Sequence, residues 1–300
     1  MTNTPLTDRT ITATAPAATV SPRTRYGRSR RLVLATLGRV LLTMVAMLVV
    51  VLSGSLLGST ALQALGAPEL VAAAGAHLLV FLLSIPVAWL LLRRLLEGDR
   101  SGYLAMGWND GRALAAAGIG VGAAVAAIAV GVLVLVLRGD ARFELLDTSG
   151  IPDLALTIVV LFTVSILLQG FPEELLWRGY LQTTLMERLG PWVAVMIGAV
   201  GFGVMHVVSM GSGATVADKV LYIVMAIGLG AASGALRLVT GSTWAAIGFH
   251  AGFHLAIRGS EFVVGGGYAG VPVAWLAVLL AIVTGVCFGV WQMRGRMVSS

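Results

Sequence analysis

The sequence has little charge and a single cysteine. Charged residues make up 11% of the 300 residues, hydrophobic residues make up 58%, and the mean hydropathy is +0.93. Soluble proteins carry about 25% charged residues, so this composition excludes an ordinary soluble domain and a disordered chain. The lone Cys287 excludes an intramolecular disulfide and a cysteine-rich structural zinc site. The composition therefore predicts an all-α, polytopic integral membrane protein that is stabilised by helix packing.

Uncharged runs of about 20 residues, the length that crosses the hydrocarbon core of a bilayer, recur along the chain. They predict eight transmembrane helices, at residues 40–58, 70–92, 113–137, 154–171, 192–210, 219–236, 242–257 and 272–293. The glycine pairs Gly118/Gly122 and Gly230/Gly234 have the four-residue spacing that lets helices approach closely. We expect both pairs to serve packing only.

The basic residues predict the orientation of these helices. With eight spans and both termini in the cytoplasm, sixteen of the 20 basic residues face the cytoplasm and four face the other side. This asymmetry is what the positive-inside rule expects. The net charge of +6 forms no basic face on a soluble domain, so we expect no nucleic-acid partner. The partner is the lipid bilayer, and the expected location is the cell (plasma) membrane.

Ionisable side chains inside the apolar segments are few, and each costs about 2.5–3.5 kcal/mol or more in lipid. Of the fourteen acidic residues, twelve lie in the tail, in loops or at the edges of the predicted spans, and the remaining two are the adjacent Glu173 and Glu174. The four histidines all lie in apolar segments, at His77, His206, His250 and His254. A lone histidine in an apolar helix is more often a packing residue than a catalyst, and we expect this of His77.

Helical geometry separates the two acids. Glu174 and Arg178 are four residues apart, so they lie on one face and are expected to pair. Glu173 points about 100° away and has no local cation. We therefore expect Glu174 to be structural and Glu173 to be a general base. Pro172 suits the first turn of a helix, so the span is expected to break at residues 170–172 and restart with the acids near its N-terminus.

His250 and His254 are also four residues apart, so both imidazoles aim at one locus. Together with Glu173 and His206 they form a set drawn from three helices. A carboxylate and an imidazole can deprotonate water, and further imidazoles can donate hydrogen bonds to an oxyanion. The motifs of other catalysts are absent from the sequence: a Gly-x-Ser-x-Gly elbow, a P-loop and a His-Glu-x-x-His helix.

Three motifs carry a resemblance to a known family. They are Glu173-Glu174-x-x-x-Arg178, then Phe202-x-x-x-His206, then a Ser-x-Trp-x-x-Ile-x-x-His run that ends at His250. In this order, each on an apolar helix, they resemble the motifs of the CAAX-protease and bacteriocin-processing (Abi) family of intramembrane endopeptidases, which includes the type II CAAX prenyl proteases. The resemblance covers roughly residues 155–257.

The resemblance implies hydrolysis of a peptide bond in a membrane-associated protein or peptide. Glu173 would activate water together with His206, and His250 would form the oxyanion hole with position 254. The family commonly has asparagine at that position, where this sequence has His254. A neutral imidazole still donates one hydrogen bond, but its availability depends on tautomer and pH. The residues implied to shape the site are Glu174, Arg178 and Phe202.

The cofactor and the function class leave alternatives open. Three imidazoles and a carboxylate suit tetrahedral zinc, so Glu173, His206, His250 and His254 are the ligand set of a zinc-dependent version. We favour the glutamate-type enzyme, which requires no cofactor, because the sequence lacks His-Glu-x-x-His and Arg178 occupies Glu174. A proton-coupled transporter and a non-enzymatic membrane scaffold remain alternatives from other classes.

The chain is expected to divide into four parts. They are a disordered, arginine-rich cytoplasmic tail (1–31), three N-terminal spans (32–150), a CAAX-protease-like catalytic membrane core (151–258), and a loop with the last span and a short cytoplasmic end (259–300). The sequence assigns neither the substrate nor the oligomeric state.

Overall fold

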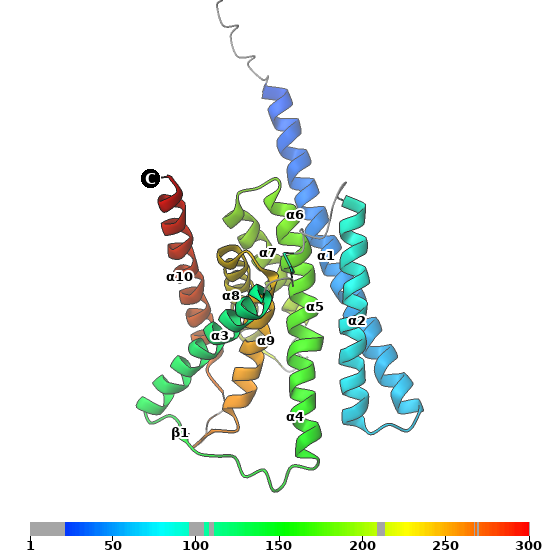
Figure 1. The fold of residues 1–300 in the computed structure, drawn as a ribbon, viewed down its shortest axis with the longest axis vertical. Coiled ribbons are helices and arrows are strands. Elements are labelled where there is room, and N and C mark those ends of the chain that lie inside the picture. The colour runs from blue at the N-terminus through cyan, green and yellow to red at the C-terminus, as the bar shows by residue number, and fades with distance from the viewer. Residues whose placement is uncertain are drawn as a thin grey trace, which may run out of the picture. The chain divides into compact units, whose positions relative to one another are not determined.

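The computed structural model describes residues 22–95, 105–107, 111–208, 214–266, 268 and 270–299. This part of the chain is almost entirely helical (Figure 1), which confirms the predicted all-α fold. The chain divides after Gly38 into two units, and all contacts described below lie in residues 39–300. One long helix, Leu154–Met186, carries the two adjacent acids and is described below. The other helices are α1 (Pro22–Ala64), α2 (Glu69–Leu95), α3 (Arg112–Leu137), α7 (Pro191–Met205), the short η3 (His206–Val208), α8 (Val216–Thr240), α9 (Thr243–Ser260) and α10 (Val273–Ser299).

The helices fit a multi-pass membrane protein. In the described part of the chain, six helices are long and apolar enough to cross a membrane. A helix occupies most of each of the eight predicted segments, but α7 has only 15 residues and α9 is not among the six. The number of crossings, the side of each terminus and the division into four parts stay predictions. Most of the predicted tail, residues 1–31, lies outside the described residues.

The two adjacent acids lie in the middle of one long helix, Leu154–Met186. Its consecutive parts are α4 (Leu154–Thr163), η1 (Val164–Gly170), α5 (Phe171–Glu174), η2 (Leu175–Gln182) and α6 (Thr183–Met186).

The predicted break at residues 170–172 is wrong. Gly170 keeps helical backbone angles, with φ −56° and ψ −49°. Pro172 lacks an N–H and crowds the carbonyl four residues earlier, which usually breaks an α-helix. Here η1 and η2, on either side of the acids, are π-helical, and Phe171 N–H bonds to the Ile166 carbonyl five residues back. The wider turns keep the helix continuous, and π-turns occur frequently at functional sites.

The α9 helix packs against α3 and against η1 (Figure 1). The contact with α3 depends on glycine, because a methyl group at Gly248 would collide with the main chain of Ala117. Gly120 of α3 approaches the main chain of α9 in the same way. Apart from the adjoining backbone of α3 itself, no described atom lies within 4 Å of a methyl group added at Gly118 or Gly122. The packing role predicted for that pair is wrong, because residues two positions from Gly120 point about 200° around the helix.

Two contacts outside the site tie distant segments together. The strands β1 (Arg142–Phe143) and β2 (Val264–Gly265) pair antiparallel and join the segment after α3 to the segment after α9. In α2, His77 Nδ1 lies 3.0 Å from Thr163 Oγ1 of α4, and that hydroxyl lies 3.1 Å from the Val160 carbonyl. The hydroxyl donates to the carbonyl, so the imidazole donates to the hydroxyl. His77 therefore has the packing role expected of it.

Candidate active site

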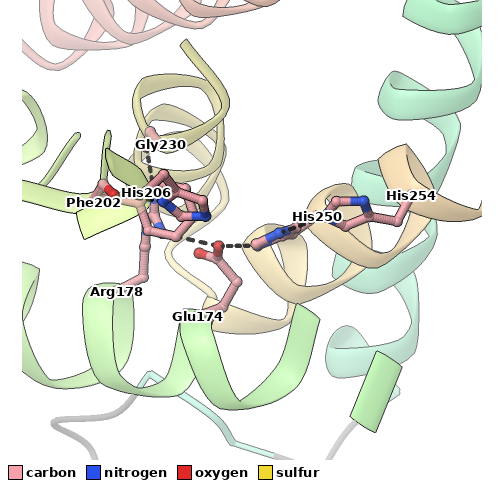
Figure 2. A network of polar contacts seen from close by, with 7 residues as sticks. All are labelled: Glu174, Arg178, Phe202, His206, Gly230, His250 and His254. Atoms are coloured by element: carbon pink, nitrogen blue, oxygen red, sulfur yellow. Dashed lines mark hydrogen bonds and ion pairs between the residues drawn. The ribbon is translucent and has the colours of Figure 1, made fainter. Parts of the chain in front are cut away.

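The carboxylate of Glu174 stands at the centre of the polar network in Figure 2. Its Oε1 atom accepts hydrogen bonds from Arg178 Nη1 at 2.9 Å and from His250 Nδ1 at 2.7 Å. All three side chains are buried, and Glu174 is fully excluded from solvent. The four-residue spacing predicted the pair with Arg178. The other partner, His250, lies 76 residues later in the sequence, so this bond joins α9 to the helix that carries Glu174.

The ring of Phe202 is the apolar centre around which the polar residues are arranged. The Arg178 guanidinium lies 4.9 Å from the centroid of this ring, a cation–π contact. The ring centroids of His206 and His250 lie 4.5 Å and 5.7 Å from it. His206 also donates its Nδ1–H to the Phe202 carbonyl at 2.7 Å, so its Nε2 is an acceptor when the ring is neutral. Phe202 is fully buried and fixes the position of three charged or titratable groups.

His250 and His254 contact each other through their Nε2 atoms, which lie 3.1 Å apart. A neutral His250 carries its proton on Nδ1, where it donates to Glu174, so its Nε2 accepts the hydrogen bond from His254 Nε2–H. The remaining nitrogen, Nδ1 of His254, is then also an acceptor. A neutral pair therefore offers no N–H to a bound substrate. One additional proton on the pair would turn His254 Nδ1 into a donor.

Glu173 lies beside this network and is 8% exposed. Its Oε2 atom is buried and has no hydrogen-bond partner among the described residues. Its charge interacts with Glu174, with Arg178 and with Tyr222 of α8. The Tyr222 ring centroid lies 6.0 Å from that of His206. Tyr222 thus interacts with Glu173 through its charge and with His206 through the rings, and no described donor is hydrogen-bonded to Glu173 Oε2 or to His206 Nε2.

Six of the seven predicted site residues are connected by direct contacts: Glu174, Arg178, Phe202, His206, His250 and His254 (Figure 2). The seventh, Glu173, is linked to them electrostatically. The contacts bring together side chains from three separate segments, as expected from the motifs. The catalytic role of each residue remains a prediction.

Sequence reasoning missed two hydrogen bonds that fasten this helix to α8. Arg178 Nη2 donates to the Gly230 carbonyl at 2.6 Å, and one turn later Gln182 Nε2 donates to the Gly234 carbonyl at 3.1 Å. Both glycines lie close to neighbouring atoms, which confirms their predicted packing role. The signal was present in the sequence, since the two donors and the two glycines share a four-residue spacing.

A buried arginine on α8 was also missed. Arg237 is 5% exposed and donates to the hydroxyls of Thr243, at 3.2 Å, and Thr183. Its Nη1 atom also lies 3.8 Å from the sulfur of Met186. Arg237 thus ties the end of α8 to α6 and to the start of α9. No motif in the sequence distinguishes it from an arginine that faces the cytoplasm.

The described residues do not fit a resident zinc ion. A catalytic zinc site has three protein ligands. Within the described ranges, no three His, Cys, Asp or Glu side chains are placed so that they could hold one metal ion. Only the Nε2 atoms of His250 and His254 converge, while His206 turns its Nδ1 to a carbonyl. We therefore derive no step through a metal.

Comparison with known families finds one match. Residues 155–256 match the family described as type II CAAX prenyl endopeptidase, Rce1-like. The matched segment covers the three motifs and includes every residue of the network in Figure 2. It confirms the resemblance predicted from the motifs. None of the curated proteins compared with the chain matches it.

Proposed function

Since residues 155–256 match the family of type II CAAX prenyl endopeptidases, Rce1-like, we propose that this protein is an intramembrane endopeptidase of the glutamate type. It hydrolyses a peptide bond in a membrane-associated protein or peptide, and it acts in the cell membrane. The observation that carries the proposal is Glu173, a buried carboxylate with an unsatisfied oxygen, which is adjacent to Glu174 and interacts electrostatically with Glu174 and Arg178 of the network. Burial of an unpaired carboxylate costs free energy, so such a group in an apolar segment is expected to be functional.

In this proposal Glu173 and His206 hold the attacking water. Both present acceptors, the Glu173 carboxylate and the His206 Nε2 atom, so a water molecule can donate one hydrogen bond to each. As the water oxygen bonds to the carbonyl carbon, one water proton passes to the Glu173 carboxylate. When the C–N bond breaks, Glu173 returns this proton to the leaving amine. His206 acts by orientation, and its Nδ1 bond to Phe202 keeps the acceptor nitrogen available.

Stabilisation of the oxyanion depends on the proton count of the histidine pair. A neutral pair has no free N–H, because His250 donates to Glu174 and His254 donates to His250. With one extra proton, His250 Nε2–H donates to His254, and His254 Nδ1–H can donate to the oxyanion. The Glu174 carboxylate, bonded to His250, would stabilise this cationic state. We therefore propose that the active form of the pair carries one positive charge.

The proposal is tested with the full-length protein in liposomes and a labelled peptide library. We expect Glu173→Gln to lower the rate of cleavage about 100-fold to 10,000-fold, the usual contribution of a general base. The matched control is Glu187→Gln, which removes an exposed acid at the end of the same helix and should cleave like the parent. Cleavage by Glu173→Gln at the rate of the parent would show that the assigned chemistry is wrong. A pH-gradient flux that depends on Glu173 would favour the transporter instead.

The cofactor is tested separately. We propose that no metal is required, because only two imidazoles converge and Glu174 is occupied by Arg178 and His250. Metal analysis of the purified protein, together with cleavage assays before and after treatment with a chelator, decides this point. Stoichiometric zinc with loss of activity on chelation would replace the glutamate-type mechanism by the zinc-dependent one.

A further inference from the structure

A third polar residue continues the histidine face of α9. His250, His254 and Arg258 follow one another at four-residue intervals, so they form one stripe along the helix. The guanidinium of Arg258 donates to Ser165 Oγ at 3.2 Å and to Gln169 Oε1 at 3.3 Å. Both partners lie on η1, in the helix that carries the two acids. Arg258 therefore joins α9 to the long helix Leu154–Met186, called the catalytic helix below because it carries Glu173 and Glu174.

The two helices form a polar seam. His250 of α9 contacts Glu174, and Arg258, eight residues later, contacts residues five and nine positions before Glu174. The helices are therefore antiparallel, and the seam runs from the Glu174 network at one end to Arg258 at the other. His254 lies between the two ends. In a segment this apolar, such a row of polar residues beside the proposed catalytic centre points to a function beyond packing.

The charge of Arg258 is not matched by a carboxylate. Among the described residues, no acid lies within ion-pair distance of Arg258, and its two hydrogen-bond partners are neutral. A guanidinium has five N–H donors, so it can bind a further acceptor. Its charge interacts with the exposed Glu261 and with Tyr222, the residue whose ring neighbours His206 and which also interacts with Glu173. The guanidinium is therefore electrostatically coupled to Tyr222, while its hydrogen bonds go to neutral groups of η1.

There is also room beside this cation. Arg258, which is half-buried, lines a pocket of about 320 Å³ together with Phe162, Leu255 and Phe262. The other side chains of the pocket are apolar, so Arg258 is the one charged residue among those that line it. A carboxylate that entered it would be held in a partly dehydrated site, where an arginine–carboxylate pair is stronger than at an exposed surface.

We propose that Arg258 is a specificity-determining residue that binds a carboxylate of the substrate. The assignment rests on the proposed peptidase function. Eight residues of helix separate Arg258 from His250, which is about 12 Å at about 1.5 Å per residue. An extended peptide covers about 3.3–3.6 Å per residue, so the carboxylate lies about three or four residues from the scissile bond. It is either the C-terminal carboxylate of the substrate or an acidic side chain at that distance.

The test uses the full chain in phosphatidylcholine vesicles and three matched pools of quenched fluorescent peptides. The first pool ends in a free carboxylate, the second in an amide, and the third ends in an amide but has an acidic residue at the last position. We expect the parent to cleave the first or the third pool at least about tenfold faster, in kcat/KM, than the second, since hydrogen bonds to charged groups contribute at least this factor. Comparing the first and third pools identifies the source of the carboxylate.

Three variants assign this preference to Arg258. Arg258→Gln should lose it, so that the ratio of kcat/KM between the carboxylate and amide pools falls to about one, and Arg258→Lys should keep part of the preference because the charge remains. The matched control is Arg188→Gln, which removes an exposed cation at the end of α6 and should keep the preference of the parent. If Arg258→Gln discriminates the pools as the parent does, or if the parent does not discriminate them, the assignment of Arg258 is wrong and the peptidase proposal stands.

A binding measurement separates this inference from the proposed function. Fluorescence anisotropy of a carboxylate-terminated and an amide-terminated peptide is measured with Glu173→Gln, alone and combined with Arg258→Gln. Tighter binding of the carboxylate peptide, lost in the double variant, supports the site even if the parent cleaves no peptide, which would be the failure of the peptidase proposal alone. Equal binding of both peptides would overturn the site.

Discussion

Replacing Arg178 by methionine tests whether the network around Glu174 holds the fold together. Arg178 is buried, donates to Glu174 at 2.9 Å and to the Gly230 carbonyl at 2.6 Å, and lies over the Phe202 ring. Removing one partner of a buried ion pair leaves an uncompensated charge and costs about 3–5 kcal/mol. Loss of the bond to Gly230 adds about 1 kcal/mol. We expect Arg178→Met to lower the free energy of unfolding by about 4–6 kcal/mol.

The assay is unfolding in mixed micelles with increasing sodium dodecyl sulfate, followed by circular dichroism. The control is Arg142→Gln, which breaks an exposed pair with Glu144 and should cost less than about 1 kcal/mol. Adding Glu174→Gln to Arg178→Met removes the stranded charge and should recover about 2–3 kcal/mol of the loss. A cost of Arg178→Met close to that of the control, or an additive double variant, would refute the view that Glu174 and Arg178 are a structural pair.

Two further predictions follow from the packing and from the histidine pair. Gly248→Ala should destabilise the protein by about 1–3 kcal/mol, because its methyl group meets the main chain of Ala117, whereas Gly118→Ala should stabilise it by about 0.5–1 kcal/mol; equal melting temperatures of the two variants would contradict this. His254→Asn should flatten the pH profile of cleavage, because an amide donates a hydrogen bond without an added proton. The activity of the parent should fall as the pH rises and the pair loses its extra proton. The same fall in His254→Asn would exclude the histidine pair as its cause.

Short-range features of the site could be predicted from the sequence, because helical geometry fixes them. The pairing of Glu174 with Arg178 and the proximity of His250 to His254 both follow from a four-residue spacing. The bond from His250 to Glu174 could not be predicted, since it depends on how α9 lies against the catalytic helix. That bond changes the interpretation of both residues. It fixes the tautomer of neutral His250, and it gives Glu174 a second partner besides Arg178.

The fold could be predicted at the level of helices and less well at the level of their contacts. Apolar length located the helices, since crossing a bilayer demands it. The choice of packing glycines failed for Gly118 and Gly122, because spacing alone does not state which face of a helix meets a neighbour. The break expected at Pro172 failed because a π-turn can absorb a proline that an α-turn cannot. The rule that proline ends an α-helix, which we applied to the sequence, does not include the π-turn.

The direction in which Glu173 and Glu174 point depends on the number of residues in the π-helical stretch before them. Each residue advances an α-helix by about 100°, so deleting one residue between Val164 and Gly170 would let this stretch relax to regular α-helix and rotate the segments on either side relative to each other. The composition of the protein would hardly change, yet Glu173 and Glu174 would be aimed at other neighbours. In this stretch, insertions and deletions should be tolerated less well than most substitutions.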